Sequence, residues 1–176
     1  MEFIMEVAQG SIDALAGESR PSSRKSPRSV RRVAMDCLAR REHSLFELKR
    51  KLQSKFPDKE PAEIQRELER LRDENLQSDK RFVECFVRYR KSRGFGFLAI
   101  RESLRSKFVS EGVIEQYLSA DDDEWTAILR SIIQRRLPGN RLKFGSKDHL
   151  RLVRFLQGRG FSQTQIQQSL SPYISS

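Results

Sequence analysis

Residues 44–56, SLFELKRKLQSKF, and residues 96–108, GFLAIRESLRSKF, decide the fold, because the second stretch repeats the pattern of the first 52 positions later. In both stretches apolar residues stand at spacings i, i+3, i+7 and i+11, which places them on one face of a helix. The offset therefore predicts a repeated helical unit. The apolar residues are Leu45, Leu48, Leu52 and Phe56 in the first stretch, and Phe97, Ile100, Leu104 and Phe108 in the second.

A third, looser copy begins another 52 residues along the chain. Leu152 and Leu156 keep the two central apolar positions, whereas His149 and Gly160 stand at the ends, with Phe161 one place further on. All three copies are therefore expected to begin a helix at the same point of the unit. Residues of N-capping type stand at the three equivalent starts, namely Ser44, Gly96 and Asp148.

Two pairs of residues strengthen the predicted helix starts. Ser44 with Glu47, and Ser162 with Gln165, have the spacing of a capping box, in which the two side chains each accept a hydrogen bond from the other residue's backbone N–H. These pairs predict helices that begin just after Ser44 and just after Ser162.

Each copy lies between two further amphipathic stretches, so the repeated unit is expected to contain three helices of about a dozen residues each. The stretch after each copy carries an apolar pair at spacing i, i+4, and the stretch before it carries apolar residues at helical spacing. The pairs are Ile64 and Leu68, Ile114 and Leu118, and Ile166 and Leu170. The preceding apolar residues are Val33, Cys37 and Leu38, then Phe82, Phe86 and Tyr89, then Trp125, Ile128 and Leu129.

We predict an all-α fold, a tandem repeat of three three-helix modules with nine helices in an elongated, curved body. The expected modules span residues 29–77, 78–120 and 121–176, and residues 138–140, Pro-Gly-Asn, are expected to form a turn. Residues 22–28, SSRKSPR, are polar, basic and interrupted by proline, and residues 1–28 are expected to form a flexible basic tail. A chance offset within one globular bundle is the alternative.

The formal net charge is +10, and the positive charge is concentrated in two blocks. Residues 81–107 hold eight basic and two acidic residues, and residues 130–159 hold nine basic and one acidic residue. Between them, residues 108–129 hold six acidic residues and no Lys or Arg. Such blocks favour a polyanionic partner, most simply a nucleic-acid backbone, although a solvated basic face without a ligand has the same composition.

The composition narrows the class of protein. At 176 residues with 37% hydrophobic content, the chain is too short for a large multi-domain enzyme. It has no apolar run of about eighteen residues and no signal-peptide pattern at its start, so we expect a cytosolic protein without a membrane partner. Cys37 and Cys85 lie within apolar-periodic segments and are expected to be buried thiols.

The sequence contains no arrangement of residues that is typical of an enzyme active site or a metal site. His43 and His149 occupy different places in their repeats and have no metal-ligand spacing, and we expect His43 to be a surface or capping residue. Residues 94–96, Gly-Phe-Gly, lack the lysine of a phosphate-binding loop and are expected to separate two helices. The four carboxylates of residues 121–124 suit a helix N-terminus. We therefore expect no enzymatic activity, cofactor, metal or small-molecule substrate.

Arginine clusters recur in all three units and form the candidate site. Arg101 and Arg105, for example, lie four residues apart on the polar side of one predicted helix. Four cations crowd the end of another predicted helix, where they also complement the helix dipole, and this structural role is the alternative explanation for the cluster: Arg88, Arg90, Lys91 and Arg93. Arg135 and Arg136 end a third helix. The candidate contacts for phosphates or acidic partner side chains are Arg40, Arg41, Arg88, Arg90, Lys91, Arg93, Arg101, Arg105, Arg154 and Arg159.

Three stretches in order resemble the signatures of the bacterial RecX regulatory proteins. They are ARREHS at 39–44 followed by Glu47-Leu48 and Lys51-Leu52, SDKRFV at 78–83 followed by RYR at 88–90 and GFG at 94–96, and RFLQGRGF at 154–161. The resemblance covers roughly residues 33–170. The chain departs from the family's pattern at Phe56 and Phe108, where the family often has Gly, and at residues 97–100, where it often has Pro-x-Arg-Ile.

The resemblance implies tandem three-helix modules that lie in the groove of the RecA nucleoprotein filament. It implies down-regulation of RecA in recombination, DNA repair and the SOS response. The regulator would limit the extension of the RecA filament and reduce the ATPase, strand-exchange and coprotease activities of RecA. RecA and the backbone of single-stranded and double-stranded DNA are the implied partners. The alternative is a stand-alone DNA-binding protein of helix-turn-helix type, since a three-helix unit with a basic face can place one helix in the major groove.

Overall fold

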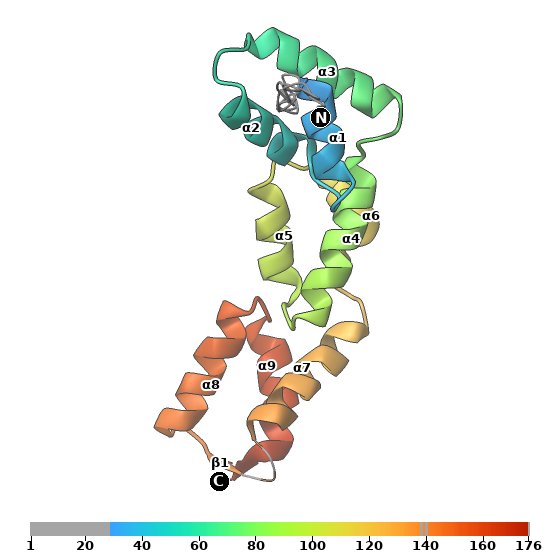
Figure 1. Ribbon diagram of the computed structural model, residues 1–176. Helices are drawn as coiled ribbons and strands as arrows, with labels where there is room; N and C mark the ends of the chain where they lie inside the picture. Colours follow the sequence, from blue (N-terminus) through green and yellow to red (C-terminus); the bar gives the residue numbers. More distant parts are fainter. Residues whose placement is uncertain (1–28, 138, 140, 176) are drawn as a thin grey trace, which may run out of the picture.

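The computed structural model of the protein describes residues 29–137, 139 and 141–175, and within them the chain forms nine α-helices. The helices form three groups of three that follow one another in an elongated body, with α1 near one end and the C-terminus at the other (Figure 1). The predicted all-α, elongated architecture is confirmed. The predicted tail, residues 1–28, lies outside the described residues, as do Pro138 and Asn140 of the predicted turn.

The three groups repeat one sequence of helices. The first contains α1 (Val30–Leu38), α2 (Leu45–Lys55) and α3 (Pro61–Asp73), and the second contains α4 (Asp79–Ser92), α5 (Phe97–Arg105) and α6 (Glu111–Tyr117). The third contains α7 (Glu124–Arg136), α8 (Lys147–Gly158) and α9 (Gln163–Leu170), followed by a 3₁₀ turn η1 (Ser171–Tyr173). Two strands absent from the prediction, β1 (Leu142–Lys143) and β2 (Ile174–Ser175), pair in parallel in the third group.

Capping residues define most of the helix starts. Ser44 accepts a hydrogen bond from the Glu47 backbone N–H, and Ser162 with Gln165 forms the predicted capping box in full. The predicted start at Asp148 is wrong by two residues, because the side chain of Ser146 caps α8 and Asp148 lies in its first turn. There the acidic side chain complements the helix dipole instead of capping the backbone.

Each group of helices has its own hydrophobic core. The first is built from residues between Val30 and Leu71, the second between Phe82 and Trp125, and the third between Leu129 and Leu170. Helix α7 contributes to two of them, because Trp125 packs into the second core and Leu129 into the third. The central repeat leucines and isoleucine are fully buried, as their spacing predicts: Leu48, Leu52, Ile100, Leu104 and Leu156 are all 0% exposed.

Three predictions of burial are wrong. Cys85 is exposed, because α4 buries Phe82, Val83 and Val87, and a residue two positions from Val83 and Val87 points to another side of the helix. Tyr89 is exposed for the same reason. Phe108 is 72% exposed, because α5 ends at Arg105 and the helical spacing no longer sets the direction of its side chain.

No helix in the described part of the chain is long and apolar enough to cross a bilayer.

The second and third groups meet at a close contact between two loop backbones. The Gly96 N–H donates to the Arg159 carbonyl at 2.8 Å, and the Leu98 N–H donates to the Gly160 carbonyl at 3.1 Å. A Cβ at Gly160 would lie 2.3 Å from the Ala99 nitrogen, and Gly160 has a φ of +87°. Only glycine fits both the space and the backbone conformation here.

We predict that Gly160→Ala lowers the free energy of unfolding by about 2 kcal/mol or more, because the new methyl group meets the Ala99 backbone and the positive φ is strained. Gly158→Ala is the matched control, since nothing lies within 4 Å of its added Cβ and the position is helical. Chemical denaturation monitored by circular dichroism measures both variants. Equal stability of the two variants would contradict the backbone contact.

Candidate functional site

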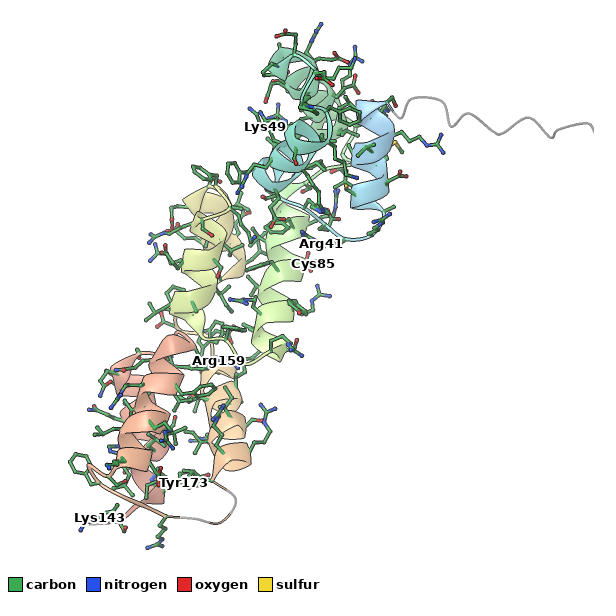
Figure 2. All side chains as sticks on the ribbon, turned by 60° about the vertical axis from the view of Figure 1, so that its left-hand side comes forward. Arg41, Lys49, Cys85, Lys143, Arg159 and Tyr173 are labelled. Carbon is green, nitrogen blue, oxygen red and sulfur yellow. The ribbon has the colours of Figure 1, made fainter. Side chains whose placement is uncertain are left out.

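Arg159, one of the predicted contact residues, lies where the second and third groups of helices meet (Figure 2). Its guanidinium carbon is 4.7 Å from the ring centre of Phe95 and 5.0 Å from that of Phe155, one ring from each group. Its Nη1 also donates to the Arg93 carbonyl at 2.8 Å. Arg159 therefore joins the two groups through cation–π contacts and a hydrogen bond to a helix terminus.

An open hollow of about 200 Å³ lies beside Arg159, and we name it the arginine hollow. Its lining contains four arginines and two apolar side chains: Arg93, Arg135, Arg136, Arg159, Ile132 and Phe155. None of these arginines has an ion pair with a carboxylate among the described residues. Four guanidinium groups without a negative partner make this hollow a fitting site for phosphate or carboxylate oxygens.

Arg90 is held beside the arginine hollow, not extended toward solvent. Its guanidinium stacks 3.5 Å from the ring centre of Phe95 and also lies 5.7 Å from that of Phe86. Burial, followed by repulsion from Arg159, lowers the pKa of Arg90. Arg90 and Arg159 both pack on Phe95, so Arg90 contributes to packing as well as to the charge of this region.

Lys91 is paired within the chain. Its ammonium binds the carboxylates of Asp122 and Glu124 and lies 4.6 Å from the ring centre of Trp125. Burial works against the ammonium charge, but the hydrogen bonds to Asp122 and Glu124 outweigh it and raise the pKa of Lys91. Two of the four consecutive carboxylates thus hold α7 against α4, and Asp123 occupies the N-cap position of α7 as the sequence suggests.

The other predicted contact residues are spread along the body. Arg101 and Arg105 share the carboxylate of Glu111, at 3.0 Å and 2.5 Å. Arg88 pairs with Glu84 and Arg41 pairs with Glu47. Arg40 and Arg154 are exposed and have no ion pair among the described residues. The structure thus gathers Arg90, Arg93 and Arg159 and leaves the rest apart; contact with a partner stays a prediction for all ten.

The first and second groups of helices are joined through Glu47. Its carboxylate, on α2, binds Arg41 at 3.1 Å and also binds Lys107, which follows α5. Burial raises the pKa of Glu47, but hydrogen bonds from Lys107 and Arg41 outweigh burial and the pKa is lowered overall. Ser44 Oγ donates to the Lys107 carbonyl at 3.3 Å, and the Leu45 N–H donates to Asp79 at 2.8 Å. This junction contains ion pairs between the two groups, whereas the glycine contact depends on backbone hydrogen bonds and on the stacked Arg159.

His43 is buried at this junction, and its prediction as a surface residue is wrong. Its Nδ1 lies 2.9 Å from the Arg41 carbonyl, and its Nε2 lies 2.9 Å from Lys51 Nζ. Burial lowers the pKa of His43, and the positive charges of Arg41 and Lys51 lower it further. The hydrogen bond to the Arg41 carbonyl raises the pKa but does not outweigh these effects. Neutral His43 therefore donates from Nδ1 and accepts from Lys51 at Nε2, which is a structural role.

Arg135 and Arg136 are functional candidates that selection from the sequence missed. Both line the arginine hollow, and the Arg136 guanidinium stacks 3.6 Å from the ring centre of Phe155. Both residues lie in the basic block 130–159, which could have marked them as candidates from the sequence. Their convergence with Arg93 depends on the contact between two modules, which the repeat pattern does not specify.

Comparison with known proteins identifies the family. The model of the RecX second three-helix domain matches residues 78–118. Regulatory protein RecX of Pseudomonas entomophila (strain L48) is 42% identical over 149 residues, covering 83% of this chain and 92% of that protein. Regulatory protein RecX of Pseudomonas putida (strain KT2440) is 38% identical over 146 residues, with the same coverage of both chains.

Solved structures share the fold. The crystal structure of RecX from Lactobacillus salivarius aligns with a TM-score of 0.64 at 20% identity and covers 82% of this chain and 94% of that one. A second crystal structure, of regulatory protein RecX, aligns with a TM-score of 0.64 at 18% identity and covers 81% of this chain and 72% of that one.

The three groups of helices and the arginine hollow define a helical protein built from three-helix modules, and its relatives are regulatory, non-enzymatic proteins. The chain belongs to the RecX family of regulatory proteins, modulators of RecA. The family resemblance drawn from the sequence motifs is confirmed.

We predict that the junction at Glu47 weakens in acid. Because the pKa of Glu47 is lowered in the folded state, its contribution to stability is complete above the ordinary glutamate pKa of about 4.3 and is lost as the pH falls through the lower folded value. Glu47→Gln should therefore destabilise the protein at pH 7. Chemical denaturation between pH 3 and 7 should show that the difference from the parent chain shrinks in acid; a constant difference would contradict the ionic junction.

Proposed function

We propose that this protein binds the RecA–DNA filament and inhibits the recombinase, ATPase and coprotease activities of RecA in homologous recombination, DNA repair and the SOS response. The observation that carries the proposal is the 42% identity to a RecX regulatory protein over 83% of the chain. In this role the protein acts in the cytoplasm, with RecA and the DNA backbone as partners.

The shape and charge of the chain support a filament as the partner. Three similar modules in a row suit a partner that itself repeats along an axis better than one short DNA site. The arginine hollow supplies four cations without carboxylate partners in the described structure, and such groups bind phosphates or acidic side chains. We propose the arginine hollow as a principal contact with the filament.

The composition of the third helices in the second and third groups argues against the helix-turn-helix alternative. That mode needs a recognition helix that presents basic and polar side chains to the bases. The third helices of the second and third groups, α6 and α9, contain no Lys or Arg, and α6 has only seven residues. Within these two groups, basic residues lie instead on α4, α5, α7 and α8. Only the third helix of the first group, α3, carries arginines among the third helices described.

The DNA-stimulated ATPase of RecA tests the proposal. We expect the protein to reduce ATP hydrolysis by RecA on single-stranded DNA at stoichiometric or lower ratios. Absence of inhibition at those ratios would overturn the regulatory function, and a sequence-specific footprint on naked DNA would favour the alternative.

We predict that the double variant Arg93→Glu and Arg135→Glu raises the concentration for half-maximal inhibition about tenfold or more, which corresponds to about 1.4 kcal/mol of lost binding. Both side chains are exposed and lie at the arginine hollow. Arg66→Glu with Arg72→Glu makes the same change of charge on exposed positions of α3 and should inhibit normally. Equal loss in both double variants would show a general effect of charge and remove the hollow from the site.

A further inference from the structure

A second basic hollow, of about 640 Å³, lies at the junction of the first and second groups of helices. We name it the platform hollow. Its lining combines basic side chains with one aromatic ring and one carboxylate. The lining residues are Arg41, His43, Phe46, Glu47, Arg50, Lys51, Ser106 and Lys107.

A pair of aromatic rings stands at the platform hollow: the half-buried Phe46 lines it, and the exposed Phe108 packs on Phe46. The ring of Phe108 packs on that of Phe46, with 4.3 Å between the ring centres and 36° between the planes. Phe108 is 72% exposed, the most exposed of the large hydrophobic side chains in the described residues. Because Phe46 covers one side of the ring, much of the remaining surface of Phe108 is accessible to a flat partner.

The backbone at Phe108 is strained. Its φ of +55° lies in the left-handed region, which disfavours a residue with a Cβ, and a large aromatic residue is unusual there. Neither burial of the side chain nor a fit to the backbone explains a phenylalanine at this position. The positive φ ends helix α5, where the Val109 N–H donates to the Leu104 carbonyl at 3.4 Å, and glycine is the usual residue at such a position. The exposed phenylalanine in its place points to a role for the ring.

The charges around the rings favour a polyanion. The single carboxylate, Glu47, is already bound by Arg41 and Lys107. Arg50 has no ion pair among the described residues and lies 5.8 Å from the ring centre of Phe46. Lys51 likewise has no carboxylate partner in the described part of the chain; its contact there is neutral His43. Two available cations therefore stand beside the aromatic pair.

We propose that the platform hollow binds single-stranded nucleic acid, with an unpaired base stacked on Phe108 and the adjoining phosphates bound by Arg50 and Lys51. Exposed aromatic rings within a basic groove are the general means by which proteins hold single strands, because every base has a flat face and every nucleotide has a phosphate. A duplex does not offer these faces, since its bases are stacked on one another. This inference deepens the proposed function, on which it rests for its biological setting, but binding to a bare oligonucleotide tests it without RecA.

The test is fluorescence anisotropy of the full chain with a dye-labelled oligothymidylate and with an abasic oligonucleotide of the same length. We expect Phe108→Ala to weaken binding of oligothymidylate about tenfold, in line with the loss of one stacked base. Binding of the abasic strand should not change. Phe144→Ala is the matched control, because Phe144 is also an exposed phenylalanine, 70% accessible, but lies in the third group of helices.

Phe108→Gly separates the role of the ring from that of the backbone. Glycine adopts a positive φ without strain, so the Gly variant should unfold at a higher temperature than the Ala variant. It should nevertheless bind oligothymidylate as weakly as the Ala variant, because both lack the ring. A defect in binding that followed stability instead of the ring would overturn the proposal.

Other outcomes would also overturn the proposal. These are unchanged binding of oligothymidylate by Phe108→Ala, an equal loss on the abasic strand, and no binding of single strands by the parent chain. If Phe108→Ala weakened inhibition of RecA but left binding of oligothymidylate intact, the platform would contact protein instead of nucleic acid. Conversely, base-dependent binding by a chain that failed to inhibit RecA would support this inference while overturning the proposed function.

Discussion

The close approach of two loop backbones at Gly96 and Gly160 is the constraint on which the arrangement of the second and third modules depends. A side chain at Gly96 would collide with the backbone of Gly160 and Phe161, and one at Gly160 would collide with Ala99 in the first turn of α5. Because neither residue has a side chain, the N–H groups of Gly96 and Leu98 donate to the carbonyls of Arg159 and Gly160, and Arg159 packs on Phe95 and Phe155. The arginine hollow exists because this contact brings the ends of α4, α7 and α8 together.

The two junctions between modules are held by different interactions. Each leaves a different set of basic side chains available to a polyanion. At the glycine contact, the arginines stack on aromatic rings and keep their charge without a carboxylate partner in the described structure. At the other junction, Glu47 pairs with both Arg41 and Lys107, whereas Arg50 and Lys51 have no carboxylate partner among the described residues. The number of basic residues therefore overestimates how many cations a polyanion can bind. Lys91, Arg101 and Arg105, for example, are also paired with carboxylates of the chain.

The repeat predicted the helices and their buried centres well, because burial within a module follows from spacing along one helix. The contacts between modules could not be read in this way, since Arg93 and Arg159 are 66 residues apart and meet only when the loops pack. The same reasoning explains the errors. Phe108 was counted with the core because it is apolar, but the helix ends before it. His43 was expected at the surface or as a cap, but it is buried in a loop that contacts the second module through Glu42 and Ser44.

The central claim is that the arginine hollow faces the filament, and site-specific photo-crosslinking tests it most directly. A photoreactive amino acid at Ser131, exposed on α7 one turn before Arg135, leaves all four arginines in place, and one at Glu69, exposed on α3, serves as the reference. With RecA assembled on single-stranded DNA, the account predicts cross-links to RecA or DNA from position 131 and few from position 69. Cross-links from position 69 alone, under conditions of full inhibition, would contradict it.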